Sequence, residues 1–343
     1  MKTFGTLPDR TPVTLFTLKT SKLEMTVSAL GGRVVTLKCP DRDGKIADIT
    51  LGYDTLDEYL KETAYFGALI GRYGNRIGNG KVVVNGHAYQ LTQNEGMNTL
   101  HSATGYHNSI WKADEQSITA ESVQLHLHDP DGKDGYPGNL DVKVRYSLTG
   151  TDLRIDYQAT TDKETVVNMT SHGYFNLAGA GHPTVLDHQL TLHADRFTPI
   201  TSGLIPIGEL RAVAGSPFDF RQPRRMGERI DGDDQQLING FGYDHNWVLN
   251  SQNGQLALAA EVYEPTTGRV MQVLTTEPGI QFYSGNHLNG MIGKSGHRYI
   301  KRSGFCLETQ HYPDSPNHSH FPSTTLKPGE LYQSRTIYRL SCK

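Results

Sequence analysis

The segment LDVKVRYSLTGTDLRIDYQA, residues 140–159, contains two runs in which apolar and polar side chains alternate. Alternation with a period of two is typical of a β-strand that has one buried and one exposed face. The residues Thr149-Gly150-Thr151-Asp152 separate the two runs, so the segment predicts an antiparallel hairpin. Similar strand-like runs occur at residues 12–18, 23–30, 33–37, 122–128, 165–177, 269–288, 305–307 and 334–340. Together they favour the all-β class and one large single-domain antiparallel β-sandwich over residues 1–343.

Two local signals add detail to this prediction. Asn85-Gly86, between residues 82–84 and 87–91, is a strong signal for a two-residue type I′ hairpin turn. Thr55, with Glu58 three residues later, has the pattern of a capping box and predicts a short helix over residues 55–61. Residues 224–230 could form one more helical turn, and little other helix is expected.

Composition and charge exclude several classes of protein. The 343 residues carry a formal net charge of −3, so neither nucleic acid nor an anionic membrane is expected as a partner. No segment approaches the roughly 20 apolar residues of a membrane-spanning helix, and the N-terminal stretch lacks the apolar core of a secretory signal. The three cysteines form no CxxC pair and suggest no disulfide framework. We therefore expect a cytoplasmic protein.

A second segment, FCLETQHYPDSPNH at residues 305–318, introduces chemistry at the end of an apolar strand. Glu308 directly follows Phe305, Cys306 and Leu307, and a buried carboxylate is costly unless it is paired or used. Pro313 and Pro316 stiffen the loop that follows. A general base is held in this way, on a rigid strand beside a stiff loop. The alternative is a glutamate that caps the backbone or pairs with an arginine.

Further polar residues fall at predicted strand ends and turns, namely Asn75, Arg76, His101, His172, Asp244 and Gln281. Four aromatic residues lie near them in the sequence, Tyr174, Phe175, Trp247 and Phe282. A sugar site needs this mixture, because amide, carboxylate and guanidinium groups bind hydroxyls while an aromatic face covers the apolar side of the ring. A histidine together with Glu308 would supply an acid and a base that work near neutral pH.

Six segments in order resemble the signature blocks of the aldose 1-epimerase (galactose mutarotase) family: GRYGNRIGNG, NTLHS, VNMTSHGYFNL, GYDHNW, EPGIQFYSGN and CLETQHYPDSPNH. They extend from about residue 66 to residue 318, and the overall length is similar to that of one family domain. The resemblance implies a large antiparallel β-sandwich and interconversion of the α and β anomers of an aldose such as galactose or glucose. It also implies that neither a cofactor nor a metal is needed, and it leaves open whether the protein is a monomer or a homodimer.

The resemblance also implies a role for each site residue. Glu308 matches the family's catalytic base, which removes the proton of the C1 hydroxyl. His172 matches the catalytic acid, which protonates the ring oxygen as an imidazolium so that the ring opens. His101 matches a histidine that contacts the sugar near the ring oxygen. The remaining matches are to residues that bind sugar hydroxyls, namely Asn75, Arg76, Asp244 and Gln281.

The chain departs from the family pattern at two places beside the site. Ser102-Ala103 follows His101 where the family commonly has Gly-Gly. Ser171 and Gly173 flank His172 where the family commonly has Asn before it and Ser or Val after it. Because both changes fall in loops next to the site, the preferred sugar is less well defined than the type of reaction.

Other hypotheses make distinct demands on the sequence. The glycine-rich segment 66–91 lacks both GxGxxG and GxxxxGK[ST], so no nucleotide is expected. His311, His318 and His320 have no carboxylate at ligand spacing, so no metal is expected.

Three alternatives to mutarotation also concern sugars. A lectin would use the same binding groups but would not need Glu308 and His172 as a pair. A glycoside hydrolase would use Asp244 and Glu308 as its two carboxylates. An enzyme for hexose 6-phosphates would need an additional basic cluster, and the sequence shows no clear one.

Overall fold

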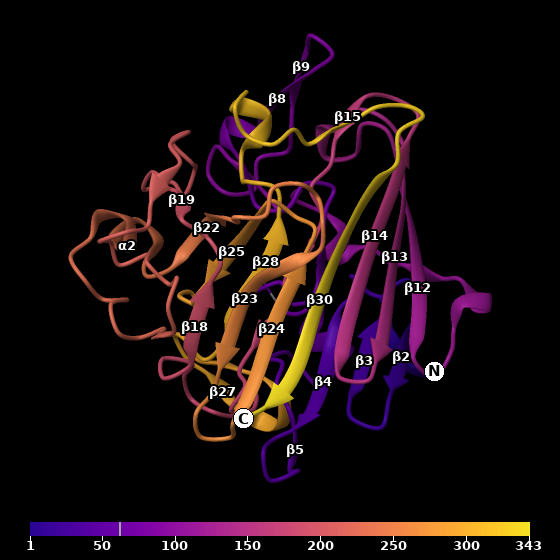
Figure 1. The fold of residues 1–343 in the computed structure, drawn as a ribbon. Helices are drawn as coiled ribbons and strands as arrows, with labels where there is room; N and C mark the ends of the chain where they lie inside the picture. Colours follow the sequence, from indigo (N-terminus) through magenta and orange to yellow (C-terminus); the bar gives the residue numbers. More distant parts are fainter. Residues whose placement is uncertain (62) are drawn as a thin grey trace.

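The computed structural model describes residues 1–61 and 63–343, which form an antiparallel β-sandwich (Figure 1). The front layer in Figure 1 is a single twisted sheet that runs from β12 on the right to β18 on the left. Two further sheets lie side by side behind it and form the second layer. The all-β sandwich predicted from the alternating runs is therefore confirmed.

The sheet of the front layer contains nine strands among the described residues. In spatial order they are β11 (Lys112–Ala113), β12 (Ser122–Asp129), β13 (Leu140–Thr149), β14 (Asp152–Thr161), β30 (Tyr332–Cys342), β24 (Arg269–Thr275), β23 (Ala257–Tyr263), β18 (Gln189–Leu192) and β21 (Arg224–Arg225). The hairpin predicted from residues 140–159 is β13–β14, and Thr149 pairs with Asp152 at its turn. The helical turn expected at residues 224–230 is wrong, because β21 begins there and pairs with β18.

The second layer combines a six-stranded and a five-stranded sheet, counted over the same described residues. The six-stranded sheet consists of β17 (Tyr174–Phe175), β28 (Phe305–Gln310), β25 (Gly279–Tyr283), β22 (Asp244–Val248), β19 (Arg196–Thr198) and β20 (Arg211–Ala212). The five-stranded sheet consists of β1 (Lys2–Thr6), β2 (Pro12–Lys19), β3 (Glu24–Ser28), β4 (Val34–Pro40) and β5 (Ile46–Asp48). A bridge between Thr50 and Phe175 joins the two sheets.

In the described residues, short strand pairs, two short α-helices and several 3-10 turns connect the large sheets. The pairs are β6 (Leu69–Ile70) with β16 (Thr170–Ser171), β7 (Arg76–Ile77) with β10 (Thr99–Leu100), β8 (Lys81–Val84) with β9 (His87–Gln90), β15 (Thr165–Val166) with β29 (Thr325–Leu326), and β26 (Met291–Ile292) with β27 (Arg298–Tyr299). The helices are α1 (Leu56–Tyr59) and α2 (Gln235–Gly240). The capping box of Thr55 and Glu58 starts α1 as predicted, whereas no sequence pattern predicted α2. Asn85 and Gly86 have the positive φ angles of a type I′ turn, 48° and 74°.

The core lies between the two layers and is filled by the apolar side chains that face inward from all three large sheets. Two buried tyrosines of the front layer also bond across it. The Tyr338 hydroxyl donates to the carbonyl oxygen of Leu307 at 3.1 Å, and the Tyr146 hydroxyl donates to that of Gly32 at 2.6 Å. Because Leu307 lies on β28, the first of these bonds anchors the strand that carries Glu308 to the front layer. The three cysteines are free thiols. In the described part of the chain, no helix is both long and apolar enough to cross a bilayer.

Candidate active site

A cavity of about 200 Å³ lies over the six-stranded sheet and brings together most of the residues selected from the sequence. Six of them line it: Asn75, Arg76, His101, His172, Asp244 and Glu308. The seventh, Gln281, is buried and donates a hydrogen bond from Nε2 to Asp244 Oδ1 at 2.7 Å. Residues separated by more than 200 positions in the sequence therefore converge on one small space.

The register of β22, β25 and β28 places the acidic residues on one face of the sheet. Gln281 pairs with Glu308, and Asp244 pairs with Tyr283. Directly paired residues share a face, and alternate residues along a strand return to that face. Asp244, Gln281, Tyr283 and Glu308 therefore project from three neighbouring strands in the same direction. The alternative in which Glu308 forms an ion pair with an arginine is not supported. Among the described residues, the ion-pair partner of Glu308 is His172.

The short pair β7–β10 positions the other side of the cavity. Leu100 pairs with Arg76, which places His101 beside Asn75. The backbone N–H of His101 donates to the Asn75 carbonyl oxygen at 3.0 Å, and the backbone N–H of Asn75 donates to His101 Nδ1 at 3.1 Å. A neutral imidazole has one N–H, so an accepting Nδ1 places the proton of His101 on Nε2. Burial also lowers the pKa of His101 well below its usual value, so the ring is neutral and its Nε2–H is a donor.

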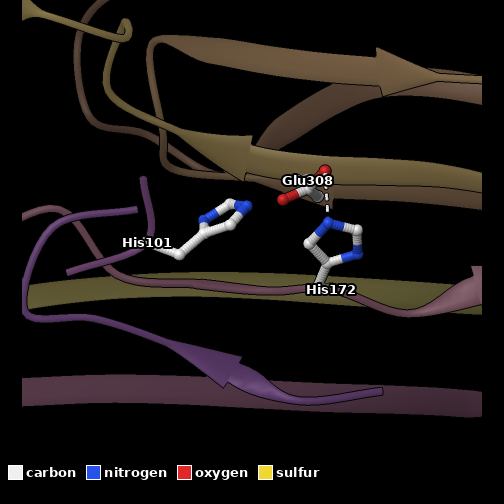
Figure 2. A group of neighbouring side chains, drawn as sticks. All are labelled: His101, His172 and Glu308. Carbon is white, nitrogen blue, oxygen red and sulfur yellow. Dashed lines mark ion pairs between the residues drawn. The ribbon is translucent and has the colours of Figure 1, made fainter. Parts of the chain in front are cut away.

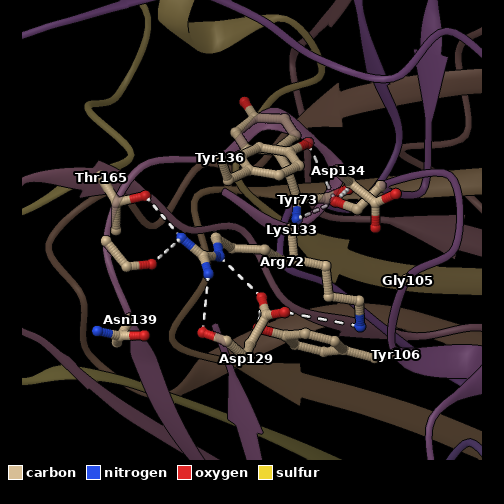
Figure 3. A network of polar contacts seen from close by, with 12 residues as sticks. Arg72, Tyr73, Gly105, Tyr106, Asp129, Lys133, Asp134, Tyr136, Asn139 and Thr165 are labelled. Atoms are coloured by element: carbon tan, nitrogen blue, oxygen red, sulfur yellow. Dashed lines mark hydrogen bonds and ion pairs between the residues drawn. The ribbon is translucent and has the colours of Figure 1, made fainter. Parts of the chain in front are cut away.

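A buried network centred on Arg72 anchors the loop that carries Asn75 and Arg76 (Figure 3). The Arg72 side chain is 1% exposed, and its Nε donates to Asp129 Oδ2 at 2.8 Å. Its other nitrogens donate to the carbonyl oxygens of Asp129, Pro137 and Gly138 and to Thr165 Oγ1. Because these acceptors belong to β12, the 130–139 loop and β15, the network attaches the site loop to the front layer and its edge.

The Ser102-Ala103 departure falls on residues with left-handed backbone geometry. The φ angles of His101, Ser102 and Ala103 are 52°, 55° and 50°. This region favours glycine, which explains why Gly-Gly suits the turn better. Ser102 offsets part of the strain, because its Oγ accepts the Tyr73 N–H at 2.8 Å and lies 3.0 Å from the Tyr136 hydroxyl. The left-handed turn that holds His101 therefore forms here with serine and alanine.

The Gly173 departure is explained by a neighbouring aromatic ring. A Cβ atom at Gly173 would lie 2.8 Å from the ring of Phe175, closer than real Cβ atoms approach other atoms. Glycine at this position therefore leaves room for the buried phenyl ring of Phe175. We find no comparable contact that explains Ser171.

The central contact of the cavity joins His172 and Glu308 (Figure 2). His172 Nε2 lies 3.7 Å from Glu308 Oε1, and the two side chains are 7% and 3% exposed. Figure 2 shows the His172 ring pointing toward the carboxylate, with the ring of His101 facing the same space. Glu308 Oε2 is buried without a hydrogen-bond partner among the described residues, as is Gln281 Oε1 on the neighbouring strand. A hydroxylated molecule would supply the partners that these oxygens lack.

Burial sets the protonation of this pair. It raises the pKa of Glu308 well above its usual value, with Asp244 acting in the same direction and Arg76 opposing both. It also lowers the pKa of His172 to about 3. The roles that the resemblance implies require an ionised Glu308 beside a protonated His172. Burial has the opposite effect, because a site with little water disfavours both a carboxylate and an imidazolium. In the free protein it therefore favours a neutral His172 and a proton on Glu308.

Several residues of the cavity were missed or misassigned. Arg76 is held by Glu95, with its Nη2 donating to Glu95 Oε1 at 2.7 Å, and nothing in the loop sequence around Glu95 indicated this role. Tyr174 lines the cavity as expected, together with Tyr65 and Tyr283. The other three aromatics were wrongly placed there, since Phe175, Trp247 and Phe282 are buried in the core. Whether a strand's aromatic faces the core or the cavity depends on register, which the sequence does not fix.

One group of three side chains in the cavity could in principle bind a metal ion. Ligand atoms of His101, His172 and Glu308 lie within 4.8 Å of one another. The fit is poor, because His101 Nδ1 already accepts the Asn75 N–H and its Nε2 carries the proton. His311 lies apart from His318 and His320, beside a separate cavity of about 470 Å³, with its Nδ1 2.6 Å from Glu277 Oε2.

Comparisons with known proteins agree with this geometry. The family model described as aldose 1-epimerase matches residues 14–339. The chain is 41% identical to the galactose mutarotase of Bos taurus over 98% of this chain and 97% of that protein. It is 36% identical to the aldose 1-epimerase of Escherichia coli over 97% of this chain and 96% of that protein.

Solved structures extend the comparison to the fold. A galactose 1-epimerase from Lactobacillus acidophilus superposes with a TM-score of 0.86 at 28% identity, covering 98% of this chain and 97% of that chain. An aldose epimerase homologue from C. elegans gives 0.88 at 28% identity, covering 96% of this chain and 99% of that chain. The matches extend over nearly the whole chain and include the strands and loops that form the cavity. The chain therefore belongs to the aldose 1-epimerase family and is an isomerase.

Proposed function

We propose that this isomerase interconverts the α and β anomers of a free aldohexose such as galactose or glucose. The observation that carries the proposal is the contact between His172 Nε2 and Glu308 Oε1, 3.7 Å apart in a buried cavity lined by hydroxyl-binding groups. Pockets for drug-sized ligands span roughly 300–1,000 Å³, and this cavity of about 200 Å³ is suited to a single sugar ring.

The proposed reaction needs one proton on the pair. Glu308, as the carboxylate, takes the proton of the C1 hydroxyl while His172 gives its proton to the ring oxygen. The ring opens to the aldehyde, the C1–C2 bond rotates, and closure with the two roles reversed gives the other anomer. The total number of protons on the pair is unchanged by a complete turnover. Burial raises the pKa of Glu308 and lowers that of His172, which favours the proton on Glu308 in the free protein, whereas the nearby Arg76 guanidinium favours the ionised carboxylate.

The remaining polar groups are proposed to hold the sugar. His101 presents Nε2–H as a neutral donor for the ring oxygen or the C1 oxygen. Arg76 and Asp244, whose Nη1 and Oδ2 atoms lie 4.0 Å apart, offer a donor and an acceptor to neighbouring hydroxyls. Asn75 and Gln281 are proposed to complete this set. Tyr65 and Tyr174 both stack on the His172 ring and so restrict its plane.

The test is polarimetry on freshly dissolved α-galactose and α-glucose. The wild-type protein is expected to accelerate the decay of optical rotation above the spontaneous rate for at least one of them. His172→Asn is expected to lose most of this acceleration. Glu277→Gln is the matched control, because it changes a buried carboxylate beside His311, outside the cavity, and is expected to keep the activity. Equal rates for the wild type and His172→Asn would contradict the proposal, and release of aglycone from a chromogenic glycoside would point to a hydrolase.

We further propose that the enzyme works in the cytoplasm as a single domain of residues 1–343, either a monomer or a homodimer, without a cofactor. The continuous core of the sandwich supports one cooperative unit. A single unfolding transition together with a defined mass in solution would support the domain and assembly proposals. Two separate transitions would contradict a single domain.

A further inference from the structure

His172 is held between two side chains of the same strand. Cys306 and Glu308 lie two positions apart on β28, so both project toward the cavity face. Cys306 Sγ lies 3.5 Å from His172 Nδ1, and Glu308 Oε1 lies 3.7 Å from Nε2. Cys306 is fully buried and His172 is 5% exposed. One edge of the imidazole therefore faces a thiol and the other faces the proposed base.

The aromatic neighbours of His172 fix the plane of the ring but do not distinguish its two nitrogens. Tyr174 stacks on it at a centroid distance of 5.0 Å and an angle of 21°, and Tyr65 at 5.7 Å and 28°. A 180° flip of the imidazole would keep both stacks. The polar contacts at its edges therefore have to determine which nitrogen faces Glu308 and where the proton resides.

The proposed reaction requires Nε2 to give and take a proton, because that nitrogen faces Glu308. A neutral imidazole can accept a proton on Nε2 only when its single N–H is on Nδ1. Nδ1–H then needs an acceptor, and in the described part of the chain the side-chain atom at hydrogen-bond distance from Nδ1 is the sulfur of Cys306. Burial raises the pKa of Cys306 well above its usual value, and the Glu308 carboxylate acts in the same direction. The sulfur therefore stays a neutral thiol, a weak acceptor that introduces no second negative charge beside Glu308.

We infer that Cys306 is a positioning residue whose sulfur accepts a hydrogen bond from Nδ1–H of His172 and thereby keeps Nε2 as the nitrogen that exchanges protons. The inference rests on the proposed function for its consequence in turnover, but the tautomer itself is a property of the free protein. A charged acceptor at this place would stabilise the imidazolium more strongly. The neutral thiol orients the ring and leaves His172 a weak base that releases its proton readily.

The kinetic test compares Cys306→Ala, Cys306→Ser and the control Cys39→Ala. Cys39 is also a buried free thiol, but it lies on β4 outside the cavity. Cys306→Ala is expected to lower kcat roughly tenfold and to change KM little. At metal sites, loss of the residue that orients a ligating histidine costs roughly 10–100-fold, and we expect the lower end of that range here. Cys306→Ser retains an acceptor and is expected to recover part of kcat. Cys39→Ala is expected to leave both constants unchanged.

The direct test is ¹⁵N NMR of the His172 imidazole in the free protein, which reports the tautomer without relying on activity. The wild type is expected to show Nδ1–H, and Cys306→Ala is expected to show a larger share of Nε2–H. A wild-type ring with Nε2–H, or a Cys306→Ala variant with unchanged tautomer and kcat, would overturn the inference. If Cys306→Ala does not fold, Cys306→Ser and the wild-type spectrum decide the question. A wild type that shows Nδ1–H but never accelerates mutarotation would refute the proposed function and leave the tautomer assignment intact.

Discussion

Replacing Arg72 with methionine tests how the site loop is held. Methionine keeps much of the apolar stem but removes the guanidinium that bonds to Asp129 and to three further acceptors. The Asp129 side chain is 5% exposed, so its carboxylate would remain buried with Lys133, 3.6 Å away, as its remaining cationic partner. Removing one member of a buried ion pair typically costs about 3–5 kcal/mol. We therefore expect Arg72→Met to lower the free energy of unfolding by about 3 kcal/mol or more.

Urea denaturation followed by circular dichroism measures this loss. Arg339→Met is the matched control, because Arg339 pairs with Asp152 at the surface with 46% of its side chain exposed. An exposed pair of this kind contributes about 0–1 kcal/mol. The double variant Arg72→Met/Asp129→Leu removes both buried charges and is expected to be more stable than Arg72→Met alone. Equal losses for Arg72→Met and Arg339→Met would refute the argument that the buried network anchors the loop.

Three further predictions follow from local chemistry. Ala103→Gly relieves a left-handed residue with φ of 50° and should raise the free energy of unfolding by about 1 kcal/mol in the same urea assay, whereas a loss of stability would contradict the strain argument. Burial lowers the pKa of His188 from 6.5 to about 3, so its contribution to stability is present above pH 6.5 and is lost as the pH falls toward 3. His188→Gln, which can still accept the Leu177 N–H, should reduce the slope of stability against pH in that window by up to about 1.4 kcal/mol per unit, and an unchanged slope would count against a buried neutral ring. Mutarotase activity should survive dialysis against a chelator, and a loss that zinc reverses would point to metal at His101, His172 and Glu308.

Much of the fold could be read from the sequence because the signals were local. The alternation of residues 140–159 has the period of a strand, and Asn85-Gly86 supplies the φ angles that a two-residue hairpin turn requires. Glu308 stood out because it is a charged residue at the end of an apolar strand. The order of the strands in the sheets was not predictable in the same way, since β30 lies between β14 and β24, far from both in sequence.

The parts of the site that could not be predicted depend on contacts between distant segments. Glu95 holds Arg76 from a loop that carries no signal of its own. Phe282 was one of the aromatic residues predicted near the sugar, but the strand register places it in the core, while the next residue, Tyr283, lines the cavity. The raised pKa of Glu308 and the lowered pKa of His172 both result from burial by the completed fold. None of these features is encoded in a short stretch of residues.

Glu308→Gln tests the central claim most directly, through the rate of optical rotation decay and the calorimetric affinity for galactose on the same sample. Glutamine has the same size and can hydrogen-bond a hydroxyl, but it cannot take the C1 proton. General-base catalysis typically contributes about 10²–10⁴-fold, so we predict a loss of that order in kcat. Galactose affinity should change far less, because exchanging one hydrogen bond for another alters binding by only about 0.5–1.5 kcal/mol. A near-normal rate in Glu308→Gln would contradict the account, and loss of rate and binding together in a folded protein would make Glu308 a binding residue.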